Sequence, residues 1–298
     1  MPETVQRGLM EFEAIGTHWR IDTPDPIPFG TETRITASIA DFDRVWSRFR
    51  PDSLVSLLAR EGGSVPVGPD GSAMLAELTR LFDLTDGAVN PLVGQALEHL
   101  GYDASYRLVP LPGEPAPVPV WDGVFSAPTA KLTISAPAVL DVGAVGKGRL
   151  VDIVSEILGH AGIERATVDA GGDLRHYGEP LRIALEHPYD ASRAVGVVTI
   201  ADGAIAASAT NRRTWADGLH HMLDARTAAP VRSIVATWAT ATTAMAADAA
   251  ASAAFFVEPD RVLAAMEDVT SVVRMPLTGP LESAGFLGRD GVNGELFG

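Results

Sequence analysis

The first third of the chain shows the hydrophobic spacing of amphipathic helices. Apolar side chains recur every three or four residues, which is the period of a helix that buries one face. The predicted helices span residues 37–49, 53–60, 73–84 and, opened by a proline, 91–100. We therefore expect an N-terminal helical lobe over about residues 36–104, followed by a proline-rich surface loop at about residues 109–120.

Short apolar runs separated by turns replace this pattern in the rest of the chain. The predicted strands span residues 12–21, 131–135, 138–142, 166–169, 181–185, 195–200, 205–208, 232–238 and 271–275. Two helices interrupt them, one starting after a glycine-rich turn near residue 146 and one covering about residues 242–256. The mixture predicts an α+β fold with largely antiparallel sheets and packed helices, in a single domain over residues 1–298.

Composition narrows the classes of function. A chain of 298 residues with 46% hydrophobic residues can bury a substantial core. Its net charge of -15 argues against a nucleic-acid partner, because phosphate backbones repel such a surface. The absence of cysteine excludes disulfides, thiolate metal sites and a cysteine nucleophile. With no signal-peptide pattern, lipid-anchor motif or long apolar run, the sequence predicts a cytoplasmic protein without a membrane span.

The segment Leu140–Asp152, L-D-V-G-A-V-G-K-G-R-L-V-D, holds three glycines around one lysine between an apolar run and a helical pattern. Such a turn presents backbone N–H groups beside a helix N-terminus, where phosphate oxygens commonly bind. Lys147 would add a positive charge for a phosphate. The glycine spacing fits neither a P-loop nor a dinucleotide fingerprint. A purely structural turn is an equal alternative from these residues alone.

Two further segments gather polar side chains. Residues 169–173, D-A-G-G-D, favour a hairpin-type turn with a capping aspartate. Residues 220–230, H-H-M-L-D-A-R-T-A-A-P, place two histidines, a carboxylate, an arginine and a hydroxyl together, with Arg212, Arg213 and Asp217 nearby. Clustered titratable groups suit acid–base or phosphate chemistry. The alternative is a solvated loop whose side chains bond locally.

Residues 236–256 are nearly all small, and Asp248 is the only charged residue among them. A carboxylate among apolar side chains is costly unless it is paired, exposed or bound to a metal. Ser252 lies four residues later, on the same helix face. A carboxylate, a hydroxyl and a phosphate suit Mg²⁺, which prefers oxygen ligands. The alternative is close helix packing with Asp248 hydrogen-bonded near the helix start.

Taken together, seven segments in this order resemble the ApbE family, the FAD:protein FMN transferases. They are E-A-I-G-T (residues 13–17), S-R-F-R-P-D-S (47–53), T-D-G-A-V-N-P (85–91), L-D-V-G-A-V-G-K-G (140–148), D-A-G-G-D (169–173), H-H-M-L-D-A-R-T (220–227) and A-A-D-A-A-A-S (246–252). Each motif is weak alone, but the ordered set spans roughly residues 12–275. The resemblance implies an ApbE-like fold.

The resemblance also implies an activity: Mg²⁺-dependent transfer of the FMN half of FAD to a threonine hydroxyl of an acceptor protein, with release of AMP. It implies that Asp248, Ser252 and the Gly146 carbonyl hold the metal, and that His221 and Asp248 are catalytic. His221 would orient the phosphates or assist proton removal from the hydroxyl. The implied FAD-binding residues are Ser47, Asn90, Lys147, Asp152, Gly171, Gly172, Asp173, His221, Asp224 and Thr227.

This chain departs from the family pattern at several positions. The family's glycines are replaced by Ala144 and Ala228, and its motif residues differ at Ile15, Leu92 and Ala225. Two alternatives therefore stand beside the transferase. One is an FAD pyrophosphatase that uses water as nucleophile and yields FMN and AMP, and the other is a catalytically silent member that binds FAD. The acceptor protein and the oligomeric state are not predicted.

Overall fold

The computed structural model describes residues 8–134, 138–216, 218–285 and 293–297. Its helices are α1 (Phe29–Trp46), α2 (Leu54–Glu61), α3 (Pro69–Leu84), α4 (Gly94–His99), α5 (Gly146–His160), α6 (Ala244–Ala253) and α7 (Pro259–Ala265). The described helices bear out the predicted helical segments, although α1 begins at Phe29, well before the predicted start. Ser135, the last residue of one predicted strand, and Asp217 lie outside the described residues.

One antiparallel sheet of nine strands dominates the fold. Its path runs through β1 (Gly8–Ala14), β2 (Thr17–Thr23), β6 (Ala166–Asp169), β7 (Asp173–His187), β8 (Asp190–Ala209), β13 (Ile234–Ala241), β14 (Val269–Pro276) and β15 (Glu282–Ala284), and β16 (Asn293–Leu296) pairs with β8. A small sheet joins β3 (Gly63–Pro66), β5 (Lys131–Ile134) and β4 (Phe125–Ser126). The α+β fold with largely antiparallel sheets, which the hydrophobic pattern predicted, is confirmed.

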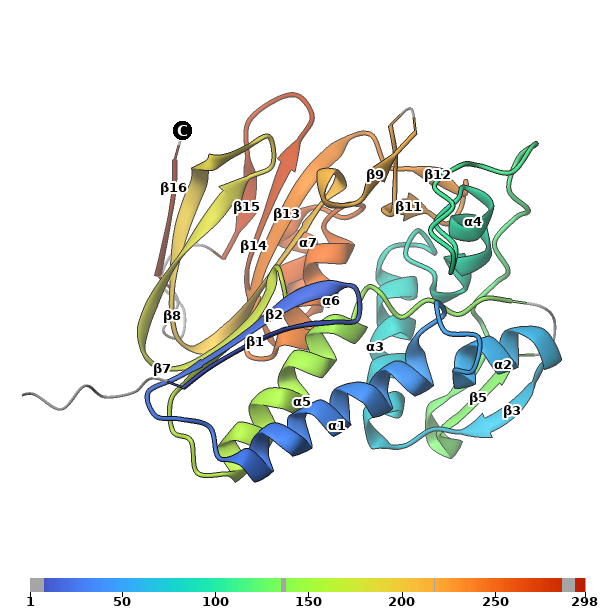
Figure 1. The fold of residues 1–298 in the computed structure, drawn as a ribbon. Coiled ribbons are helices and arrows are strands. Elements are labelled where there is room, and N and C mark those ends of the chain that lie inside the picture. The colour runs from blue at the N-terminus through green and yellow to red at the C-terminus, as the bar shows by residue number, and fades with distance from the viewer. Residues whose placement is uncertain (1–7, 135–137, 217, 286–292, 298) are drawn as a thin grey trace, which may run out of the picture.

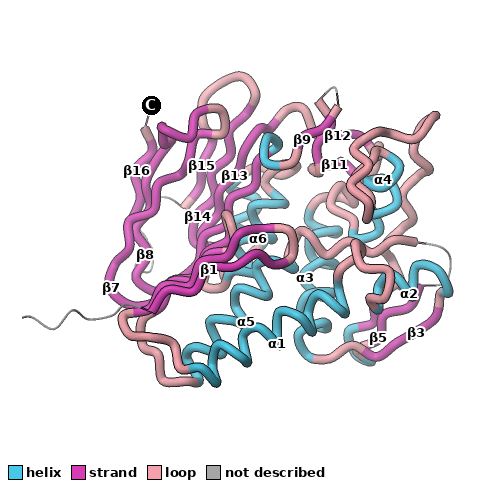
Figure 2. Tube along the Cα trace, viewed as in Figure 1, coloured by secondary structure: helices cyan, strands magenta, loops and turns pink. Residues whose placement is uncertain are grey.

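Helices cover one side of the large sheet in two layers (Figure 1). α5 and α6 pack against β7, β8 and β13, and α1 and α3 pack on the outside of these two helices. Figure 2 shows the strands of the large sheet on the left with α1 and α5 beneath them, and β3 and β5 of the small sheet apart from it at the lower right. Lobe residues such as Ile35 and Leu75 share one hydrophobic core with Leu150 of α5 and Val168 of the sheet. This shared core supports the single-domain organisation, which stays a prediction.

The opposite face of the sheet buries a second, smaller core. Leu185, Val198, Trp238 and Val273 pack together there. The long strand β8 serves both halves of the sheet, since its residues 196–199 pair with β16 and its residues 204–209 pair with β13. The predicted strands at 195–200 and 205–208 are therefore parts of one strand.

Two sequence predictions about strands are wrong. Residues 12–21 form a hairpin rather than one strand, because Ile15 and Gly16 adopt positive φ angles of 45° and 76° and reverse the chain. Residues 138–142 form no strand. Their apolar side chains are buried against the lobe instead, where the Asp141 N–H donates to the Pro91 carbonyl at 2.7 Å.

α5 and α6 each supply a carboxylate that accepts hydrogen bonds from backbone N–H groups in the first turn of the other helix. Asp152 of α5 accepts hydrogen bonds from the N–H groups of Ala244 and Met245 at 2.8 and 2.9 Å, which begin α6. In return, Asp248 of α6 accepts from the N–H of Gly148 in the first turn of α5 at 3.1 Å. Each carboxylate thus satisfies N–H groups that a helix leaves without an internal partner. The exchange fixes the two helix starts against each other.

Substitution of Asp152 by alanine is expected to destabilise the protein by about 2 kcal/mol, because two buried N–H groups of α6 lose their acceptor. The matched control is Glu156→Ala on the same helix, whose half-exposed carboxylate pairs with Arg149 at 2.8 Å. That variant should change the free energy of unfolding by less than about 0.5 kcal/mol. Urea unfolding measures both. Equal stability of the two variants would refute this role of Asp152.

Candidate active site

The first turn of α5 forms the centre of the candidate site. Gly148 lies so close to α6 that a Cβ atom there would stand 2.3 Å from the carbonyl oxygen of Ala244. This contact leaves room for hydrogen only, so glycine is required by the helix–helix approach. The Gly148–Asp248 hydrogen bond joins residues 100 positions apart in the chain. The glycine turn and the lone aspartate of α6, both singled out from the sequence, therefore meet.

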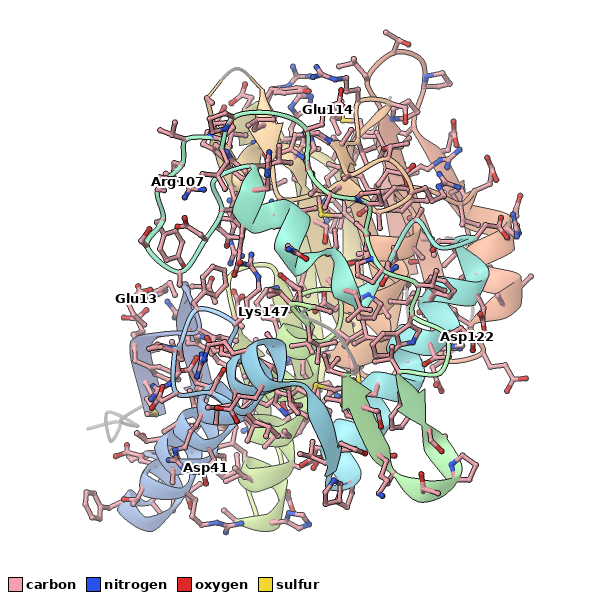
Figure 3. All side chains as sticks on the ribbon, turned by 90° about the vertical axis from the view of Figure 1, so that its right-hand side faces the viewer. Glu13, Asp41, Arg107, Glu114, Asp122 and Lys147 are labelled. Atoms are coloured by element: carbon pink, nitrogen blue, oxygen red, sulfur yellow. The ribbon has the colours of Figure 1, made fainter. Side chains whose placement is uncertain are left out.

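Lys147 points from the same turn to Asp173, with which it forms an ion pair. Figure 3 shows Lys147 in the middle of the molecule, whereas Glu13, Arg107 and Asp122 lie towards its edge. Burial disfavours the charged ammonium, but the carboxylates of Asp173 and Asp248 outweigh burial and raise the pKa of Lys147. The predicted phosphate-binding lysine is thus already neutralised by a protein carboxylate.

Asp248 is buried, with 3% of its surface exposed. Burial and the neighbouring Asp173 carboxylate raise the pKa of Asp248 to about 8, against the opposing effects of Lys147 and the Gly148 N–H. Ser252 is also buried, four residues along α6 on the same face. Asp173 Oδ1 is buried without a hydrogen-bond partner among the described residues. Oxygen atoms of acidic and hydroxyl side chains are therefore concentrated at this point.

Asp173 reaches this cluster because a tight hairpin turn joins β6 to β7. Gly171 and Gly172 hold φ angles of 67° and 123°, and Asp169 Oδ1 accepts from both of their N–H groups. The two strands pair directly, with Asp169 opposite Leu174. The predicted hairpin with a capping aspartate is confirmed. Asp169 caps the turn, which leaves Asp173 available to Lys147.

A second short hairpin carries His221. β9 (Thr214–Trp215) pairs with β10 (Leu219–His220), with Thr214 opposite His220, so Arg213 and His221 flank the last pair of the hairpin. His221 Nδ1 is buried and makes no hydrogen bond within the described part of the chain. Burial and the positive charge of Arg213 lower the pKa of His221 to about 3. The imidazole is therefore neutral near pH 7 and keeps a free lone pair.

His221 is expected to remain uncharged between about pH 5 and pH 8, so its imidazole Cε1–H NMR signal should not shift across that range. Its unfolded pKa is near 6.5 and its folded pKa is lower. The stability that neutral His221 contributes is therefore present above pH 6.5 and is lost as the pH falls below it. In His221→Gln the free energy of unfolding should decline less steeply from pH 6.5 to pH 4. A His221 signal that titrates near pH 6.5 would contradict the assignment.

Sequence reasoning missed a buried ion pair beside this hairpin. Arg48 donates from Nε to Asp141 Oδ2 at 2.6 Å and from Nη1 to the Tyr102 carbonyl at 2.9 Å. Burial opposes ionisation of Asp141, but Arg48 keeps the pKa of that carboxyl below its ordinary value. Arg48 Nη2 is buried without a partner among the described residues. Asp141 lies within the glycine-turn motif, so the sequence could have marked it as a site residue. No feature of the sequence indicated that Arg48 is its partner.

Aromatic rings enclose this ion pair. Phe49 stacks on Tyr106 at 5.3 Å between ring centroids, and Tyr102 stacks on Trp215 at 5.4 Å. The Arg48 guanidinium lies 4.1 Å from the Phe49 ring centroid. These rings form one surface, the aromatic wall. It is built from the loop after α4, the end of α1 and the β9–β10 hairpin.

Asp224 and Thr227 shape a turn next to His221. Asp224 lies opposite Ala229 in the pair formed by β11 (Leu223–Asp224) and β12 (Ala229–Pro230). Its carboxylate pairs with Arg226 at 2.7 Å, and the Thr227 hydroxyl donates to the Asp224 carbonyl. Both line a hollow of about 300 Å³ that also reaches Phe255, just after α6. Local side-chain bonds build this loop, and its part in ligand binding stays a prediction.

Other predicted residues lie around the centre with different contacts. Ser47 ends α1 beside Arg48. Asn90 accepts from the Leu92 N–H and donates to the Pro119 carbonyl, so its amide links the lobe to the proline-rich loop. Gly146 begins α5, two residues before Gly148, whose N–H contacts Asp248. The structure therefore brings Gly146, Lys147, Asp173 and Asp248 together, while the side chains of Asn90 and Asp152 are occupied by backbone groups.

Comparison with known proteins decides the family. The model of the ApbE family matches residues 15–274. The chain belongs to the ApbE family. In fold it is similar to the ApbE protein of Thermotoga maritima, with a TM-score of 0.77, 22% identity and coverage of 93% of this chain and 96% of the other. It is also similar to the flavin transferase ApbE of Vibrio cholerae, with a TM-score of 0.74, 23% identity and coverage of 94% and 96%. These likenesses establish an ApbE-like fold.

Curated relatives in the ApbE family carry the name FAD:protein FMN transferase. The Rhodobacter capsulatus protein is 28% identical over 81% of this chain, and the match covers 50% of that relative. The Vibrio cholerae protein is 28% identical, with 79% of this chain and 76% of that relative covered. The chain thus spans half of one such relative and about three quarters of another. In the described residues, no helix has the length and apolarity to cross a membrane.

Proposed function

We propose that this chain transfers the FMN half of FAD to a threonine hydroxyl of an acceptor protein and releases AMP. Its family membership and the names of its relatives support a flavin transferase. The observation that carries the proposal is the contact of the Asp248 carboxylate with the glycine turn at Gly148. This contact places a buried acid at a helix N-terminus, where a diphosphate and a cation can meet.

The residues present fit Mg²⁺. The described residues contain no group of three or more His, Cys, Asp or Glu side chains arranged for a metal. Mg²⁺ in phosphate chemistry is commonly held by one or two carboxylates together with substrate phosphates and water. We propose that Asp248, the Ser252 hydroxyl and the Gly146 carbonyl hold it. The raised pKa of Asp248 reflects buried negative charge that a cation would neutralise. When bound, Mg²⁺ supplies charge neutralisation on the diphosphate oxygens.

The reaction breaks the P–O bond between the two phosphates of FAD and forms a new one. The threonine oxygen bonds to the FMN phosphorus, the diphosphate bridge oxygen leaves with AMP, and the hydroxyl proton must be accepted by a base. We propose that the free Nδ1 of His221 takes this proton or orients the phosphates. An adjacent diphosphate raises the pKa of His221, because a nearby anion favours the imidazolium.

The direct test is incubation of the protein with FAD, Mg²⁺ and threonine-bearing acceptor proteins. Mass spectrometry follows AMP and FMN, and flavin fluorescence is read on the acceptor after denaturation. A transferase yields AMP only with an acceptor and leaves flavin on it. AMP and free FMN without an acceptor would identify the pyrophosphatase, and FAD binding without AMP would identify the silent member.

The Ser252 hydroxyl provides a paired prediction. Ser252→Ala should lower the rate of flavin transfer by about tenfold to a hundredfold, since an oxygen ligand of the cation is lost. Ser252→Thr keeps the hydroxyl and should retain most of the rate. Initial rates at saturating FAD measure both. Equal rates for the alanine and threonine variants would remove Ser252 from the site.

A further inference from the structure

The two cations nearest the candidate site are already neutralised by protein carboxylates. Lys147 is paired with Asp173, and Asp248 adds a second carboxylate to that pair. Arg48 is paired with Asp141 at 2.6 Å. FAD brings a diphosphate with two negative charges to this region. Besides the proposed cation, a positively charged side chain without a carboxylate partner would have its charge available to these phosphates.

Arg213 is a side chain of this kind. No described carboxylate lies within ion-pair distance of its guanidinium. Its side chain donates from Nη1 to the neutral hydroxyl of Tyr102 at 2.8 Å, which leaves further N–H donors of the guanidinium for a ligand. The hydroxyl holds the planar group in one orientation.

Arg213 lies at the aromatic wall, where its guanidinium contacts Tyr102. It flanks the β9–β10 hairpin beside His221, because Thr214 pairs with His220, and its charge acts on His221. Its charge also acts on Asp141 and on Lys147, so Arg213 lies within electrostatic reach of both. A guanidinium Nη2 atom also lies 3.9 Å from the position that a Cβ on Gly16 would take, at the tip of the β1–β2 hairpin. Arg213 thus lies beside the tip of the β1–β2 hairpin, close to His221 and within electrostatic reach of the glycine turn.

We propose that Arg213, rather than Lys147, is the side chain whose positive charge binds a phosphate oxygen of the dinucleotide. This inference rests on the proposed function. A guanidinium can donate two parallel hydrogen bonds to a phosphate and is more weakly hydrated than an ammonium, so it suits a partly buried anion site. Lys147 instead holds Asp173 in place beside Asp248.

The neighbouring Arg212 is a matched control. It has the same chemistry one position away, but its exposed side chain pairs with Glu186 at 2.9 Å. Substitution of either arginine by glutamine removes one positive charge from the segment just before β9. A difference between the two variants therefore reports position rather than net charge.

The experiment is calorimetric binding of FAD, ADP and riboflavin to the full chain. ADP carries the diphosphate without the flavin, and riboflavin carries the flavin without phosphate. Arg213→Gln should weaken FAD and ADP binding by at least about tenfold and leave riboflavin binding unchanged, because a charge-assisted hydrogen bond is lost. Arg212→Gln should bind all three as the wild type does.

Two further variants guard against a folding defect. Arg213→Lys keeps the charge and should lose less ADP affinity than Arg213→Gln, and Tyr102→Phe should weaken ADP binding by about twofold to fivefold through loss of orientation. If Arg213→Gln binds ADP as tightly as the wild type, or loses as much affinity for riboflavin as for ADP, Arg213 is not the phosphate-binding side chain. Either result leaves the proposed function in place. A wild-type protein that binds no FAD removes the proposed function as well.

Discussion

Asp248→Asn is expected to lower the rate of flavin transfer by about a thousandfold or more while the protein stays folded. The amide oxygen can still accept from the Gly148 N–H, so the helix contact at 3.1 Å survives. The negative charge is lost, and with it the charge-based hold on the cation, which is worth several kcal/mol in the transition state. Transfer rates measured with FAD, Mg²⁺ and an acceptor give the effect.

The control for this variant is Asp260→Asn. Asp260 lies exposed in the first turn of α7, a helix that packs against β14 and β15. The Asp260→Asn variant should transfer flavin at the wild-type rate. Wild-type transfer by Asp248→Asn would remove Asp248 from the chemistry, and a collapse of its melting temperature would show that its role is structural.

Gly148→Ala is expected to destabilise the protein by about 3 kcal/mol and to abolish transfer. A Cβ atom at this position would lie 2.3 Å from the Ala244 carbonyl oxygen and 2.8 Å from the Met245 Cα, and both are backbone atoms at the start of α6. The two helices must separate to accommodate it, which costs packing energy and parts Asp248 from the glycine turn. Urea unfolding and transfer rates measure the two effects.

Gly159 in the same helix gives the opposite expectation. A Cβ there would meet nothing within 4 Å. Gly159→Ala should therefore stabilise the protein by about 0.5–1 kcal/mol, because alanine loses less backbone entropy than glycine in a helix. If both alanine variants shift stability in the same direction, close helix approach at Gly148 is not the cause.

The spacing of apolar residues along the chain predicted much of the secondary structure. The apolar spacing of residues 73–84 predicted most of α3 (Pro69–Leu84), and residues 166–169 were predicted as the strand β6. Helix and strand periods are written into neighbouring residues, so they can be read locally. The apolar run at residues 138–142 was read wrongly for the same reason. Its burial comes from the lobe, through backbone contact with Pro91, and apolarity alone does not distinguish that from strand pairing.

The contacts of the candidate site were less accessible from the sequence. The sequence singled out the glycine turn and Asp248, and the ordered motifs connected them only through the family resemblance. The pairing of Gly148 with Asp248 spans 100 residues, and that of Arg48 with Asp141 spans 93. No local period encodes such pairs. The sequence predicted that Lys147 is available to a phosphate. Its partner Asp173 becomes a neighbour only when the β6–β7 hairpin folds back on α5, so the ion pair could not be read from the sequence.

The central claim is that Asp248, set against the glycine turn of α5, holds a divalent cation beside the diphosphate of FAD. Calorimetric titration of Mg²⁺ into the FAD-loaded protein tests it most directly. The account predicts one binding event in the wild type and its loss in Asp248→Asn, with FAD still bound in both. Equal Mg²⁺ affinity in the two proteins would contradict it.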